Sequence, residues 1–181
     1  KMGERSLAIA NIVRSAYMVL MIPVFAFGST TNSLVSNIIG QGRSDEVILL
    51  IKKVIVLNFA LIGSIAIVLA IFPHAMISIY TNNPELIRQT IPSFYVVMSA
   101  LMFFSFSSIL FSGVSGTANT ATALFIEFLT IVVYLSYTWF IAEFLKLNIT
   151  WVWTSEYIYF LFLSLLSFLY LRSGRWRHKV I

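Results

Sequence analysis

Five long apolar segments dominate this chain, and their length limits the folds that it can adopt. An α-helix rises about 1.5 Å per residue, so about 20 residues cross a hydrocarbon core of about 30 Å. Within lipid the backbone must satisfy its own hydrogen bonds, which only helices and closed barrels do. The segments lack the alternating pattern of barrel strands, so we predict an all-α, polytopic transmembrane helix bundle. The predicted spans cover about residues 12–39, 47–72, 90–112, 121–142 and 149–171.

The composition argues against a water-soluble domain. Of the 181 residues, 59% are hydrophobic and 10% are charged, whereas soluble domains carry about 25% charged residues. The net charge is +5, but the basic residues lie in loops and in the tail, a pattern that favours anionic lipid headgroups over nucleic acid. The chain has no cysteine and two histidines, so we expect no metal site. It lacks the usual hydrolase, P-loop and dinucleotide motifs, so we expect neither an enzyme nor a cofactor.

The distribution of Lys and Arg predicts an orientation, because short cytoplasmic loops carry an excess of them. The end of the bundle that includes the C-terminal tail carries seven, and the other end carries five. We therefore expect the C-terminus in the cytoplasm. The seven are Arg43, Lys52, Lys53, Arg172, Arg175, Arg177 and Lys179, and the five are Lys1, Arg5, Arg14, Arg88 and Lys146.

The first span carries a stripe of small and polar residues. Gly28, Asn32, Ser36 and Gly40 recur every four residues and so share one helix face. The stripe has two possible roles, which do not exclude each other: close packing against another helix, and a wall of a water-filled cavity that Asn32 would line. Pro23 lies within the span and removes one backbone hydrogen bond, which predicts a kink.

The turn after this span contains Gly40, Gln41 and Gly42, followed by Asp45. Glycines at this place end a helix and permit a positive φ. Asp45 falls at the start of the next helix, where the helix dipole favours an anion. We assign this segment as a cytoplasmic turn.

Glu127 is the one acidic residue placed deep within a predicted span. A carboxylate at membrane depth costs at least about 2–3 kcal/mol, so it pairs, takes up a proton or faces water. Glu127 either reaches the interface or a basic partner, or it lies on a transport path with Asn32 and Asn119. Asn119 or Thr120 is also expected to cap the same helix. Glu143 and Glu156 are expected to face water at the opposite end.

Residues 7–47, LAIANIVRSAYMVLMIPVFAFGSTTNSLVSNIIGQGRSDEV, resemble the eighth span and following loop of MATE-family (multidrug and toxic compound extrusion) transporters. The shared pattern is an Ala-rich start, a central Pro or Gly, a small and polar second half, and Gly-Gln, Gly and an acidic residue at the exit. The turn SGVSGTANTAT at 112–122 resembles the family's turn between spans ten and eleven. The resemblance covers essentially the whole chain and implies that it holds spans eight to twelve of a twelve-helix protein.

This resemblance implies that residues 1–181 form a C-terminal transmembrane lobe, with the N-terminal lobe and span seven outside the sequence. It implies an antiporter of the plasma membrane, in bacteria the inner membrane, that exports amphipathic or cationic drugs in exchange for H⁺ or Na⁺ by alternating access. Many members carry coupling carboxylates in spans seven and ten. Span seven is not in this chain and residues 90–112 hold no acidic residue, so Glu127 is the carboxylate that remains as a candidate.

Two other functions stay open. A lipid-linked oligosaccharide flippase of the same superfamily needs several basic residues in its cavity for pyrophosphate, and here only Arg14 lies near a span. A non-transporting membrane scaffold needs no cavity, and the polar face of the first span argues against it.

Overall fold

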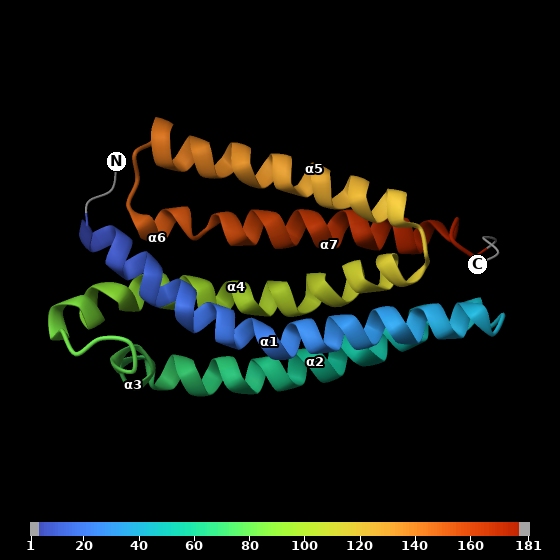
Figure 1. The fold of residues 1–181 in the computed structure, drawn as a ribbon, viewed down its shortest axis with the longest axis horizontal. Coiled ribbons are helices and arrows are strands. Elements are labelled where there is room, and N and C mark those ends of the chain that lie inside the picture. Colours follow the sequence, from blue (N-terminus) through green and yellow to red (C-terminus); the bar gives the residue numbers. More distant parts are fainter. Residues whose placement is uncertain (1–3, 178–181) are drawn as a thin grey trace.

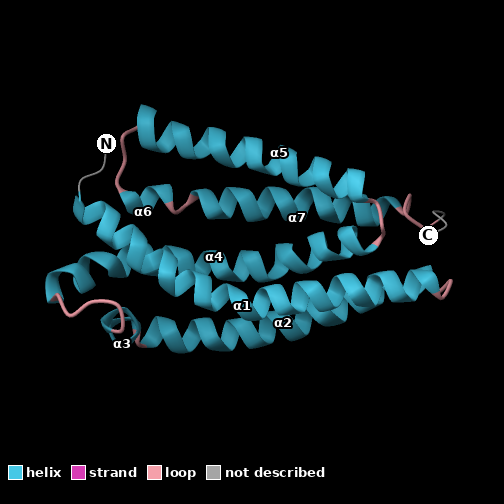
Figure 2. Cartoon of the chain, viewed as in Figure 1, coloured by secondary structure: helices cyan, strands magenta, loops and turns pink. Residues whose placement is uncertain are grey.

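A computed structural model of the protein describes residues 4–177, and within this range the regular structure is entirely helical (Figure 2). Lys1 and Lys179, which entered the charge comparison above, lie outside the described residues. The elements in chain order are α1 (Glu4–Gly40), the 3₁₀ turn η1 (Ser44–Glu46), α2 (Val47–Ile71), α3 (Pro73–Ser78), α4 (Pro84–Gly116), α5 (Thr120–Trp139), the π-helical turn η2 (Phe140–Phe144), α6 (Ile149–Val152) and α7 (Ser155–Ser173).

The described residues contain five helical segments that are long and apolar enough to cross a membrane, which confirms the predicted fold class. Two of these helices extend beyond the apolar spans that were predicted for them. α1 begins at Glu4, and α4 begins at Pro84 because the Asn83 side chain accepts hydrogen bonds from the next two free backbone N–H groups, at 3.0 and 3.2 Å. The last predicted span is interrupted at residues 153–154, between α6 and α7.

α4 lies at the centre of the bundle (Figure 1). It packs against α1, α2 and α7, while α5 lies at the edge and packs chiefly against α7. In Figure 1 the helices follow one another in the order α5, α7, α4 and α1, and α2 packs against both α1 and α4. Figure 1 also shows that α1 changes direction near its middle, where Pro23 lies within the helix.

Small residues allow α1 and α4 to approach closely. A Cβ added at Gly116 would lie 2.8 Å from the backbone oxygen of Asn32, and one added at Gly28 would lie 2.9 Å from the Ser112 hydroxyl oxygen. The Ser36 hydroxyl donates a hydrogen bond to the Gly116 backbone oxygen at 3.0 Å. Close packing thus accounts for part of the stripe on the first span.

The turn after α1 uses its two glycines differently. Gly40 is the last helical residue, whereas Gly42 adopts a φ of 75°, in the left-handed region. The expected positive φ therefore falls on Gly42, because the helix continues through Gly40.

Substitution of Gly116 by Ala should loosen the contact between α1 and α4. The new methyl group would overlap the Asn32 backbone oxygen, which cannot move without moving α1, and overpacking of this kind costs about 1–3 kcal/mol. We expect Gly116→Ala to lower the melting temperature of the detergent-solubilised full-length protein. Gly40→Ala is the matched control, because nothing lies within 4 Å of its added Cβ. Equal melting temperatures for the two variants would contradict this packing.

Candidate functional site

A groove runs between α1 and α5, with α4 and α7 as its floor. It has two adjoining parts, with volumes of about 530 Å³ and about 370 Å³. The two parts share Phe25, Phe104, Glu127 and Tyr159 as lining residues. We call this the central groove.

Glu127 lies in the wall of the central groove that α5 provides. Its carboxylate accepts a hydrogen bond from the Tyr159 hydroxyl at 2.5 Å, and its side chain is half-buried. The ring of Tyr134 meets Tyr159 edge-on, with the ring centroids 5.7 Å apart. The hydrogen-bond partner of Glu127 is thus a phenol rather than a basic residue.

A second carboxylate, Glu156, lines the same groove. It is half-buried and accepts a hydrogen bond from the hydroxyl of the buried Tyr17 at 3.4 Å. Glu143 is exposed, whereas Glu156 is half-buried and faces the central groove. The reason is the interruption between α6 and α7: α7 restarts at Ser155, so Glu156 lies in its first turn and faces α1.

A sequence signal for Glu156 does exist. Glu156, Tyr159 and Leu163 are spaced three and four residues apart, which places them on one face of a helix. All three line the central groove. The spacing places Glu156 on the same helix face as Tyr159, and the contact of Tyr159 with Glu127 shows that this face meets α5.

The chemistry of the groove suits a cation. Two carboxylates and several aromatic rings line it, and the described lining residues include no Lys or Arg. Carboxylates at membrane depth attract cations, and aromatic faces add cation–π attraction of about 0.5–2 kcal/mol.

Asn32 lies in the polar part of the groove, on α1, with Ser29 beside it and Ser108 and Ser112 across on α4. Its backbone oxygen packs against Gly116 while its side chain is exposed. One residue therefore belongs both to the packing face and to the groove wall.

Asn119 does not line the central groove, so the structure does not join it to Glu127. Its side chain is already engaged: the carbonyl oxygen accepts from Thr122 N at 3.4 Å as the cap of α5, and the amide donates to the Tyr170 hydroxyl at 2.9 Å. The cap is confirmed, and the side chain ties the turn after α4 to α7. Pro23 lies between the groove residues Met21 and Phe25 on α1.

The remaining predicted residues lie in the turn between α1 and α2, away from the groove. Arg43 donates to Glu46 at 2.6 Å from both Nε and Nη2, and to Gln41 at 3.1 Å. The Glu46 carboxylate raises the pKa of the Arg43 guanidinium. Asp45 is exposed in the 3₁₀ turn that leads into α2.

Comparison with known proteins decides the family. The sequence profile of the family described as MatE matches residues 1–140. The chain belongs to the MatE family. Together with the five membrane-crossing helices of the described range, this makes it a membrane-integral protein. The MatE match includes Glu127 and ends before α7, which carries Tyr159 and Glu156.

One curated relative of this MatE chain is the "Probable multidrug resistance protein NorM" of Thermotoga maritima. The two are 22% identical over 160 residues, which cover 88% of this chain and 34% of the relative. The chain thus spans about a third of the relative's length. No solved structure is significantly similar to the chain.

Cysteine labelling can test whether the central groove holds water. The chain has no cysteine of its own. In the full-length protein, with any other cysteines replaced, we expect Asn32→Cys to react with a charged, membrane-impermeant maleimide at least about tenfold faster than Thr31→Cys, because reactivity follows exposure. Thr31 is fully buried on the adjacent face, and its hydroxyl donates to the Phe27 backbone oxygen at 2.7 Å. Similar rates at the two positions would mean that the groove is not aqueous.

Proposed function

We propose that this chain forms one wall of the substrate path of a multidrug efflux transporter and that the central groove takes up organic cations. The main support for this proposal is the composition of the groove. Two carboxylates and several aromatic rings line it, and the described lining residues include no basic side chain. Membership of the MatE family supports transport, and the name of the Thermotoga maritima relative supports drugs as substrates.

Glu127 is the group that we propose for coupling. An ionised carboxylate has about four acceptor sites, and the Tyr159 hydroxyl occupies one of them, so room remains for a cation. If the drug cation and H⁺ or Na⁺ compete for this carboxylate, binding of one releases the other, since such linkage is reciprocal. Competition at one site is the simplest basis for antiport.

Glu156 supplies a second acceptor in the same groove. It lies in the first turn of α7, toward the end of the bundle that holds α6, whereas Glu127 lies about two turns from the start of α5 at the other end. In alternating access a cation would meet the two carboxylates in succession as the groove opens to either side. An N-terminal lobe of the same protein would cover the open face of the groove.

The proposal includes a bacterial inner-membrane location with the C-terminus in the cytoplasm, which the excess of basic residues at that end supports. It also disfavours an oligosaccharide flippase. A pyrophosphate group would be repelled by Glu127 and Glu156 and would find no basic partner among the described residues that line the groove.

Replacement of Glu127 by Gln should remove the cation site while keeping the size of the side chain. In inverted vesicles that contain the full-length protein, we expect Glu127→Gln to lower ethidium transport driven by an imposed H⁺ or Na⁺ gradient by at least about tenfold, because an interaction with a charged group contributes about 1.5–3 kcal/mol. Glu143→Gln is the matched control, because Glu143 lies on the same α5–η2 segment but is exposed and outside the groove. Unchanged transport and ion dependence in Glu127→Gln would rule out the coupling role. If neither the wild type nor Glu143→Gln transported ethidium, the result would favour a non-transporting scaffold.

Tyr159→Phe tests the hydrogen bond rather than the charge. The phenol occupies one acceptor site of the carboxylate and so competes with an incoming cation, and a hydrogen bond to a charged group contributes about 1.5–3 kcal/mol. Without this competition, we expect half-maximal inhibition of transport by an added drug cation at a concentration about tenfold lower. Tyr137→Phe is the control, since the Tyr137 hydroxyl bonds to Thr154 outside the groove. A shift of equal size in both variants would count against a specific role for Tyr159.

A further inference from the structure

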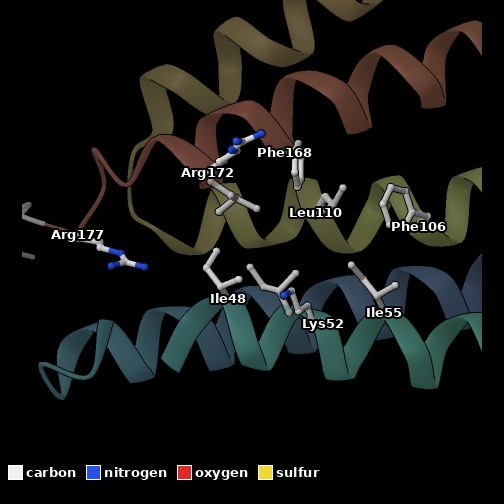
Figure 3. Close-up of a pocket in the computed structure, with 10 residues that line it drawn as sticks. Ile48, Lys52, Ile55, Phe106, Leu110, Phe168, Arg172 and Arg177 are labelled. Carbon is white, nitrogen blue, oxygen red and sulfur yellow. The ribbon is translucent and has the colours of Figure 1, made fainter. Parts of the chain in front are cut away.

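A second groove lies on another face of the bundle, between α2, α4 and α7 (Figure 3). It has a volume of about 450 Å³ and shares no lining residue with the central groove. Ile48, Ile55, Phe106, Leu110 and Phe168 form its apolar part. We call it the basic groove, for the reason given next.

Three cationic side chains line the basic groove: Lys52, Arg172 and Arg177. They come from α2, from the last turn of α7 and from the turn that follows α7. Figure 3 shows Arg172 and Arg177 toward one end of the groove, with Phe106 and Ile55 toward the other. The ion pairs found among residues 4–177 join Arg5 to Glu85 and Arg43 to Glu46, so these three charges have no carboxylate partner within that range.

The position of Arg177 is built into the turn after α7. Gly174 adopts a φ of 67° and ends the helix, and Arg177 N then donates to the Gly174 backbone oxygen at 3.0 Å. Trp176 is 1% exposed and its indole N–H donates to the Leu171 backbone oxygen at 3.0 Å. The Arg177 guanidinium lies 5.5 Å from the centre of the Trp176 ring. A buried tryptophan thus holds this arginine at the groove.

We propose that the basic groove binds an anionic phospholipid, with an acyl chain along its apolar part and the phosphate at Lys52, Arg172 and Arg177. Within a bilayer any acyl chain can fill an apolar groove, so selection must come from the headgroup, and basic pockets between helix ends recognise anionic lipids. Lys52 lies in the second turn of α2 and Arg172 in the last turn of α7, close to the ends of their helices, as a headgroup requires. The proposal does not depend on the transport function.

Charge complementarity also decides against other occupants. A drug cation would be repelled by three positive charges, and a soluble phosphate would leave the apolar part empty. A zwitterionic lipid would fill the apolar part, but its headgroup has no net charge and would not neutralise the three cations. An anionic lipid satisfies both parts of the groove at once.

Native mass spectrometry of the full-length protein, released from detergent after addition of dioleoylphosphatidylglycerol, tests the proposal. We expect the wild type to retain this lipid, and the variant Lys52→Ala/Arg172→Ala/Arg177→Ala to bind it at least about tenfold more weakly, since each basic residue near the surface contributes about a fivefold factor. The matched control is Lys53→Ala/Arg88→Ala/Arg175→Ala, which removes three exposed cations outside the groove and should bind as the wild type does. Dioleoylphosphatidylcholine should bind at least about tenfold more weakly, and glycerol phosphate should not displace the bound lipid.

A second variant keeps the charges and fills the apolar part. Ile55→Trp should also weaken retention of phosphatidylglycerol, because the larger side chain occupies the space of the acyl chain. Four outcomes would overturn the proposal: undiminished binding by the triple variant, equal loss in the control, equal binding of phosphatidylcholine, or displacement by glycerol phosphate. Undiminished binding by Ile55→Trp would overturn it as well. If the triple variant does not fold, Arg177→Ala compared with Arg175→Ala gives the same decision.

Discussion

The close contact between α1 and α4 is the interaction on which the rest of the arrangement depends. Glycine at 116 lets the backbone of α1 approach at Asn32 to a distance that any side chain would block. Apolar burial cannot drive helices together in lipid, so packing of this kind and hydrogen bonds such as Ser36 to Gly116 must hold them. Because α1 is fixed against α4, it stands apart from α5, and the space between them is the central groove.

The fold was largely predictable from the sequence because its determinants are local. The length of each apolar run sets a span, and the caps at Asn83 and Asn119 depend on residues two or three positions away. The interruption between α6 and α7 was not predicted, because the apolar run continues through Trp153 without a Gly or Pro to mark a break. Helix ends were also misplaced where polar residues continue a helix beyond its apolar part, as at Glu4.

The site was predictable only in part, because it depends on contacts between distant segments. Glu127 stood out as a charge within an apolar run, and the structure places it in the groove. Glu156 did not, because its environment is set by Tyr17, which is 139 residues away in the sequence. Asn58 shows the same dependence outside the groove: it is fully buried on α2, and its amide donates to the Ser105 backbone oxygen of α4 at 2.9 Å. Asn119 lies outside the groove, and its side chain is engaged by the cap of α5 and by Tyr170.

α4 and α7 separate two surfaces of opposite charge. On α4, Phe104, Ser108 and Ser112 face the central groove, whereas Phe106 and Leu110 face the basic groove. On α7 the division runs along the helix: Glu156 and Tyr159 lie in its first turns and Arg172 in its last. Electrostatic interactions strengthen where water is excluded, so carboxylates and cations on one surface would neutralise each other. α4 and α7 keep the two sets of charges apart, and among residues 4–177 no ion pair joins a carboxylate of the central groove to a cation of the basic groove.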